Sequence, residues 1–135
     1  MKAKKVIIVV LAVCNLFVFS LIARGVKPGC VAPTGSMAPT IKDWALILYA
    51  PAAEYAEKDI IVFTVEGELI CHRIVEKEAN TYRTKGDCEG MIVDPWIVAN
   101  EQVRGKVLWI VNWPSSMAGR YISGSWRKTG ENTRK

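Results

Sequence analysis

The sequence lacks the cysteine and histidine patterns of most disulfide scaffolds and metal sites. Its 135 residues include one histidine, His72, and four cysteines, with no C-x-x-C spacing. Cys14 lies in an apolar N-terminal run, which leaves an odd number (Cys30, Cys71 and Cys88) for the remainder. A disulfide framework and a metal held by His72 with the two later cysteines are both disfavoured. A Cys71–Cys88 disulfide stays open in an oxidising compartment, and no cofactor is expected.

Positive charge is scarce in the part of the chain that would have to bind nucleic acid. The formal net charge is +5, yet residues 25–118 carry nine Lys and Arg against twelve Asp and Glu. The excess lies at the two ends, in Lys2, Lys4, Lys5, Arg120, Arg127, Lys128, Arg134 and Lys135. Because nucleic-acid binding needs a basic face on the folded domain, no nucleic-acid partner is expected. Basic ends fit membrane topology signals or contacts with anionic lipid.

Long apolar runs are also missing, apart from the segment VIIVVLAVCNLFVFSLIA at residues 6–23. As a helix it would reach about 27 Å, enough to cross the core of a bilayer. Three lysines precede it, while Arg24 and Lys27 follow it. We therefore predict a single-pass anchor in the cell membrane, with residues 1–5 in the cytoplasm and the body outside. The alternative is a cleaved secretory signal, but a small-x-small cleavage pattern is hard to find, and CVA at residues 30–32 is followed by Pro33.

The body, residues 25–113, has no convincing helical period and is predicted to be one mainly β domain. Strands are expected over residues 44–50, 59–65, 68–77, 81–87 and 101–113. Glu66-Gly67 indicates a tight hairpin, and Gly105 indicates a bulge in the last strand. The predicted architecture is a folded-over antiparallel sheet or partly closed barrel. Residues 114–135 form a basic, Trp-containing tail, either at the membrane surface or disordered.

One serine lies in a stretch that could be more than a turn. PTGSMAPTI, residues 33–41, places Ser36 between Gly35 and Met37, with Pro39 three residues on. Such a stretch alone is typical of an ordinary turn. A serine nucleophile needs a base within hydrogen-bond reach, and the single histidine, His72 in ELICHRIV, is the candidate. Alone, that histidine would be interpreted as a partly buried structural side chain.

Two aspartates follow in TKGDCEGMIVDP, residues 84–95. Acidic residues in a turn usually stabilise the turn itself. Here the preceding strand would lie beside His72, whose neighbour Arg73 points to the opposite face of its strand. One of Asp87 and Asp94 could orient the imidazole while the other pairs with Arg73.

Taken together, TGSMAPT, HRIV, TKGD…DP and GKV, in this order behind an N-terminal anchor, resemble signal peptidase I. The resemblance covers the anchor and most of residues 30–110. The HR pair resembles the endoplasmic-reticulum, archaeal and spore-former members, whereas most bacterial members have lysine in place of His72. The resemblance implies a serine endopeptidase that removes signal peptides from exported preproteins after small-x-small sequences.

The resemblance also implies residue roles. Ser36 would be the nucleophile and His72 the general base, oriented by Asp94, although the two aspartates could exchange roles. The Ser36 N–H and the Thr34 hydroxyl would form the oxyanion hole.

Supporting residues follow from the same resemblance. Asp87 would brace Arg73. Gly35 and Pro39 would shape the loop, and Met37 would pack beneath Ser36 and line the substrate groove.

The substrate would be extended and added as a strand beside shallow apolar pockets, with Ile60, Val62 and Ile70 as candidate wall positions. Two alternatives are a peptidase dedicated to one pilin, matrix or conjugation client, and an inactive membrane-anchored β domain that only binds. Whether membrane subunits join the chain stays open.

Overall fold

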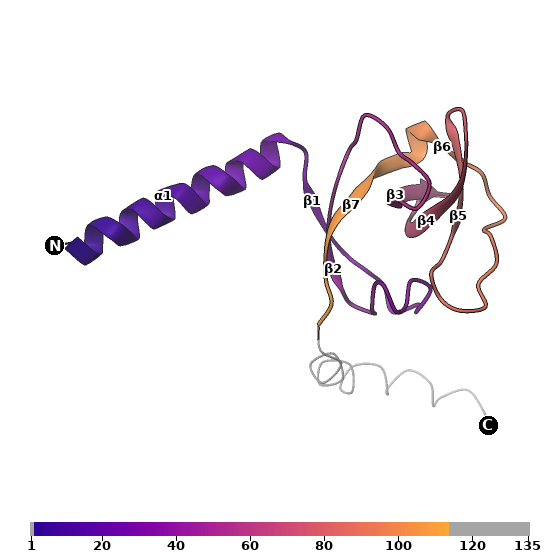
Figure 1. Cartoon of the computed structure of the whole chain (residues 1–135), viewed down its shortest axis with the longest axis horizontal. Helices are drawn as coiled ribbons and strands as arrows, with labels where there is room; N and C mark the ends of the chain where they lie inside the picture. The colour runs from indigo at the N-terminus through magenta and orange to yellow at the C-terminus, as the bar shows by residue number, and fades with distance from the viewer. Residues whose placement is uncertain (1, 114–135) are drawn as a thin grey trace, which may run out of the picture.

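The computed structural model describes residues 2–113, which form one N-terminal helix and one β-sheet body (Figure 1). The helix α1 spans Lys2–Ala23, and none of its residues is buried. Its mean hydropathy reaches 3.0 over an 18-residue window, so it is long and apolar enough to cross a membrane. The helix contains the whole predicted segment 6–23. The predicted tail at 114–135 lies outside the described residues.

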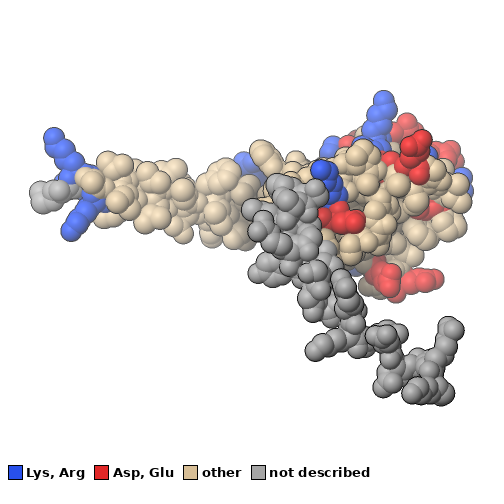
Figure 2. Space-filling model, turned by 90° about the horizontal axis from the view of Figure 1, so that it is seen from below, with Lys and Arg blue, Asp and Glu red and all other residues tan. Residues whose placement is uncertain are grey.

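Charge is distributed along the molecule as the sequence suggested. Figure 2 shows basic side chains at the start of α1, an uncharged stretch along the rest of the helix, and both signs of charge on the body. A helix with a long uncharged stretch and no buried residue has no protein surface to cover it within residues 2–113. A bilayer would supply the missing apolar surroundings.

The body is a seven-stranded antiparallel sheet, which confirms the coarse prediction of a mainly β domain. Its strands follow the order β1-β2-β7-β3-β4-β5-β6. Their bounds are Lys27–Cys30 (β1), Leu46–Ala50 (β2), Ile60–Val65 (β3), Glu68–Glu78 (β4), Thr81–Lys85 (β5), Val98–Ala99 (β6) and Val103–Val111 (β7). A three-residue 3-10 turn, η1, at Asn100–Gln102 is the one helical element described within residues 24–113.

The five predicted strands all occur, with ends shifted by at most two residues. Two strands were not predicted. β1 contains Pro28 and Gly29, which are rare inside strands. It forms an edge of the sheet, where the missing N–H donor of a proline is tolerated. β6 has two residues and is too short to leave a periodic signal.

The predicted hairpin joins β3 to β4 and sets the register on which the site depends. Glu66 and Gly67 both have positive φ, as a two-residue hairpin turn with the favoured twist requires. The register places Ile61 opposite His72 and Ile60 opposite Arg73. His72 therefore lies on β4, directly opposite the buried core residue Ile61.

The long last strand, β7, crosses between β2 and β3 and bends the sheet. Val62 pairs with Gly105 but Phe63 pairs with Val103, so β7 has an extra residue next to the predicted bulge position. A Cβ at Gly105 would lie 2.6 Å from the backbone of Ala50, which explains the glycine there. The bulge bends β7 and increases its local twist.

Two groups of buried side chains hold the folded sheet together. The first lies under the loop between β1 and β2 and contains Met37, Ile41, Ala45, Ile47, Tyr49 and Val62. The second lies between β3 and the β5–β6 edge and contains Tyr55, Ile61, Phe63, Ile74, Tyr82 and Val98. Burial of an apolar side chain contributes about 1.5–3 kcal/mol, so each group fixes the elements around it.

Candidate active site

Ser36 lies in the loop between β1 and β2, and backbone contacts fix this loop. Gly35 has a φ of +68°, a conformation that glycine adopts without strain, and its N–H donates to Oδ1 of Asp43 at 3.0 Å. The carbonyl oxygen of Ser36 accepts a hydrogen bond from the N–H of Cys88 at 3.0 Å. A Cβ at Gly86 would lie 2.4 Å from that same oxygen. The Ser36 loop is therefore held directly against the chain that follows β5.

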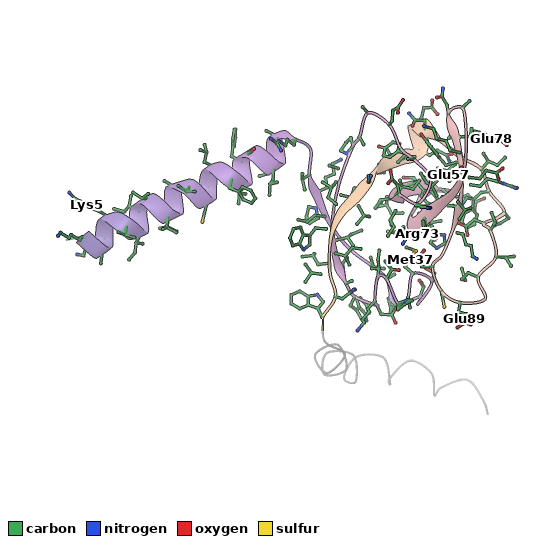
Figure 3. The ribbon with its side chains drawn as sticks, viewed as in Figure 1. Lys5, Met37, Glu57, Arg73, Glu78 and Glu89 are labelled. Carbon is green, nitrogen blue, oxygen red and sulfur yellow. The ribbon has the colours of Figure 1, made fainter. Side chains whose placement is uncertain are left out.

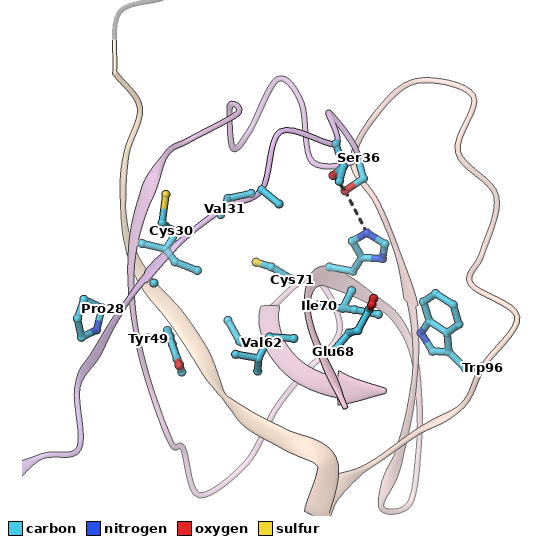
Figure 4. A pocket seen from close by; sticks show the side chains of 16 residues that line it. Pro28, Cys30, Val31, Ser36, Tyr49, Val62, Glu68, Ile70, Cys71 and Trp96 are labelled. Atoms are coloured by element: carbon cyan, nitrogen blue, oxygen red, sulfur yellow. Dashed lines mark hydrogen bonds between the residues drawn. The ribbon is translucent and has the colours of Figure 1, made fainter. Parts of the chain in front are cut away.

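His72 connects the serine to an aspartate from a distant loop. Its Nε2 atom lies 3.3 Å from Oγ of Ser36, the contact drawn as a dashed line in Figure 4. Its Nδ1 atom lies 2.7 Å from Oδ2 of Asp94. His72 as a whole residue is 7% exposed, and strand pairing with Ile61 fixes its backbone. Because a carboxylate accepts hydrogen bonds, this contact assigns the proton to Nδ1 and leaves Nε2 free to accept from the serine.

Asp94 is held by Thr84, which sequence analysis did not single out. Both side chains are buried, at 6% and 0% exposure. The Thr84 hydroxyl donates to Oδ2 of Asp94 at 2.6 Å, and the Asp94 N–H donates to the Thr84 carbonyl at 2.8 Å. A signal was present, because strand alternation puts Thr84 on the same buried face as Tyr82. A polar side chain at a core position needs a partner.

Arg73 and Asp87 form a second pair on the other face of β4. The guanidinium donates from Nε to Oδ1 at 2.7 Å and from Nη2 to Oδ2 at 2.5 Å. It also donates from Nη1 to the carbonyl of Lys58 at 2.7 Å. These hydrogen bonds lower the pKa of the Asp87 carboxyl, with a further hydrogen bond from Thr40 acting in the same direction, and they raise the pKa of Arg73. The structure thus brings Asp94 to His72 and Asp87 to Arg73, as the resemblance led us to expect.

Thr34 places a hydroxyl next to the serine. Its Oγ1 lies 3.2 Å from Oγ of Ser36, at the exposed mouth of the site. A short hydroxyl at this position can rotate to donate to a neighbouring oxygen. The expected oxyanion partner is therefore adjacent to the nucleophile.

A cleft of about 520 Å³ begins at Ser36 and His72 and runs between β1 and the first half of β4 (Figure 4). Its walls are mostly apolar or small. The lining residues are Pro28, Gly29, Cys30, Val31, Ala32, Thr34, Ser36, Ile47, Tyr49, Val62, Glu68, Leu69, Ile70, Cys71, His72 and Trp96. Within the described chain, β1 pairs only with β2, and residues 68–72 pair only with β3. Two strand edges therefore face the cleft with unpaired backbone groups.

The residues expected to shape the loop and line the groove lie in different environments. Met37 is 1% exposed and belongs to the core under the nucleophile loop, as Figure 3 shows, and it does not line the cleft. The prediction that it packs beneath Ser36 fits this position, whereas the prediction that it lines the groove does not. Pro39 is exposed on the same loop. Of the expected wall positions, Val62 and Ile70 line the cleft, while Ile60 packs against the core.

The described cysteines are all free thiols, so Cys71 and Cys88 form no disulfide. Cys71 lies in the cleft wall next to His72 in sequence. Burial, with a smaller contribution from the negative charge of Asp87, raises the pKa of the Cys71 thiol to about 12. The thiol stays protonated at neutral pH and is a poor nucleophile.

A hydroxyl, an imidazole and a carboxylate in line are the components of an activated serine nucleophile. They arise here from three separate segments: the loop after β1, the middle of β4 and the loop after β5. Comparison of the sequence with known protein families and with curated proteins finds no match. The function therefore has to be argued from this geometry.

Proposed function

We propose that this protein is a membrane-anchored serine endopeptidase of the signal peptidase I type, which removes signal peptides from exported proteins after small-x-small sequences. The observation that carries the proposal is the hydrogen-bonded line Ser36–His72–Asp94 at the end of an apolar cleft, with contacts of 3.3 and 2.7 Å. The apolar N-terminal helix and the open strand edges of the cleft support the choice of substrate.

Acylation begins at Ser36. Its Oγ attacks the carbonyl carbon of the scissile peptide bond while Nε2 of His72 takes the hydroxyl proton. The carbonyl electron pair moves onto oxygen, where the Ser36 N–H and the Thr34 hydroxyl donate to the developing negative charge. Each such donor typically stabilises the transition state by about 2.7–4 kcal/mol.

The imidazole then returns its proton. Nε2–H of His72 donates to the leaving nitrogen, the peptide C–N bond breaks, and an ester to Ser36 remains. A water molecule attacks the ester while the same nitrogen takes its proton. That proton then passes to Oγ of Ser36 as the acyl C–O bond breaks and the acid product leaves. Asp94 holds the required tautomer throughout and stabilises the positive imidazolium.

The cleft suits an extended peptide with small side chains near the cut. A substrate strand added in the cleft would pair with the open edges of β1 and the first half of β4. The backbone groups of those two edges would then be hydrogen-bonded. Val62, Ile70 and Tyr49 give the cleft apolar walls. The preference for small residues near the cut is part of the proposal and is carried by the resemblance to signal peptidase I.

The bilayer is the proposed partner of both α1 and one face of the body. Paired strand residues point to the same side, so the registers Leu46↔Val111 and Leu48↔Trp109 place four apolar side chains together. Trp109 is 66% exposed. β1 pairs with β2 and begins four residues after α1 ends, so this face lies next to the proposed membrane exit. With residues 1–5 in the cytoplasm, the body would work outside the membrane.

The direct test is cleavage of a precursor with an Ala-x-Ala signal peptide by the full chain in liposomes. Wild type should cut after the second alanine, while Ser36→Ala and His72→Ala should lose at least about 10³-fold in kcat. Ser20→Ala, a serine on α1, is the matched control and should cut normally. Unchanged cleavage by Ser36→Ala would refute the proposed nucleophile.

Acidification gives a second test. A general base must be neutral to accept the serine proton, so kcat/KM should fall on acidification. The measurement is a pH profile of precursor cleavage with the protein checked for folding at each point. Undiminished activity at about pH 5 would contradict a histidine base.

A further inference from the structure

The cleft contains an acidic side chain that the proposed chemistry does not use. Glu68 is the first residue of β4, is exposed, and lines the end of the cleft opposite Ser36. Strand residues two apart share a face, so Glu68 and Ile70 point to the same side of β4 as His72. Figure 4 shows Glu68 beside Ile70, on the side of the cleft that Trp96 occupies.

Its surroundings leave the carboxylate unneutralised. Among the described lining residues, Glu68 carries the one carboxylate, and none is a lysine or arginine. No ion pair or side-chain hydrogen bond holds it within residues 2–113. A negative group with low-dielectric walls on either side favours a positive ligand group and disfavours a negative one.

The distance along β4 assigns the position in the substrate. Glu68 lies four positions before His72, which is about 13 Å along an extended strand. A peptide strand added alongside advances at the same rate. If its first residue before the cut lies beside His72, its fifth residue before the cut lies beside Glu68.

The direction of the substrate follows from the anchor. β1 and the first half of β4 both run toward Ser36 and His72, so Pro28 and Glu68 lie at the same, distal end of the cleft. α1 joins the body at this end, because β1 begins four residues after Ala23. A precursor whose membrane segment precedes the cut would enter here.

We propose that Glu68 is a specificity-determining residue that selects substrates with lysine or arginine at the fifth position before the scissile bond and rejects acidic residues there. The inference rests on the proposed peptidase function, because that function supplies the substrate strand. It adds a charge requirement to the small-residue requirement near the cut.

The test uses short peptides with alanine at the first and third positions before the cut and Lys, Ala or Glu at the fifth. For the full wild-type chain in detergent, kcat/KM should follow Lys > Ala > Glu. Each step should be about threefold to fivefold, carried by KM and reduced by salt, as for an exposed ion pair. Glu68→Gln should remove the preference, and Glu68→Lys should reverse it. Glu66→Gln, which removes a carboxylate outside the cleft, should leave the order unchanged.

Binding separates this inference from the proposed function. The affinity of Ser36→Ala for the same labelled peptides, measured by fluorescence anisotropy, requires no catalysis. A Lys preference in binding without cleavage by wild type would support Glu68 and refute the peptidase. Cleavage of all three peptides at equal kcat/KM would overturn the role of Glu68 and leave the peptidase intact. A protein that neither binds nor cuts them would overturn both.

Discussion

Asp94 is buried, and its Oδ2 accepts two hydrogen bonds, from Nδ1 of His72 and from Oγ1 of Thr84. A buried carboxylate is costly unless such donors replace its water. The two donors also fix the direction of the carboxylate, which in turn fixes the imidazole. Thr84 is thus a positioning residue that acts through Asp94.

Thr84→Val keeps the shape of the side chain and removes the donor. We expect the free energy of unfolding to fall by about 1.5–3 kcal/mol, the range for hydrogen bonds to a charged group. We also expect kcat to fall, because the imidazole loses part of its orientation. Chemical denaturation and precursor cleavage measure the two effects.

Thr84→Ser is the matched control, since it removes a methyl group and keeps the hydroxyl. It should retain most of the activity that Thr84→Val loses. Equal activity in the two variants would show that the hydroxyl has no positioning role.

At the scale of elements, β4 carries two adjacent side chains that hold the two ends of one loop. His72 binds Asp94 on the buried face, and Arg73 binds Asp87 on the other. The same loop donates from the N–H of Cys88 to the carbonyl of Ser36. One strand therefore positions His72, and the loop it holds positions Ser36.

The Asp87–Arg73 pair makes stability depend on pH in a defined direction. The pKa of Asp87 is lower in the folded protein than its reference value of 3.8, so the folded state favours the carboxylate. This contribution is complete above the unfolded pKa and is lost as pH falls through the folded pKa. Acidification below about pH 4 should therefore destabilise wild type more than Asp87→Asn.

Urea denaturation at neutral pH and at about pH 3 measures the difference. Glu89→Gln changes an exposed carboxylate on the same loop (Figure 3) and is the control, which should behave like wild type. If Asp87→Asn and wild type lost equal stability on acidification, the ion pair would have no part in holding the loop.

At the scale of the whole molecule, the short connection between Ala23 and Lys27 joins α1 to the part of the body that carries the apolar face of β2 and β7. Tethering alone raises the effective concentration of a membrane-bound substrate at the site. Contact between the Trp109 face and lipid would further limit how the body turns, and would keep the open end of the cleft near the bilayer.

Trp109→Glu should disturb this arrangement without touching the cleft. Burial of an aromatic side chain is worth about 1.5–3 kcal/mol, so cleavage of precursors embedded in liposomes should fall about tenfold or more. Cleavage of short soluble peptides should not change. Ile97→Glu places the same charge on an exposed apolar residue next to β6 and should affect neither substrate. Equal losses on both substrates would point to misfolding rather than to lost lipid contact.

The sequence by itself determined the apolar helix, five of the seven strands and the hairpin at Glu66-Gly67, because length, alternation and turn chemistry are local properties. It also supplied a serine, one histidine and two aspartates as candidates. Tertiary structure decided that Asp94 rather than Asp87 contacts His72. That pairing depends on the β4–β5 register and on the hydrogen bond that the Thr84 hydroxyl donates to Asp94. The same holds for Met37, which the folded sheet buries, and for the edge strand β1, which pairing with β2 creates. Each of these depends on contacts between segments far apart in the chain, and local pattern does not encode them.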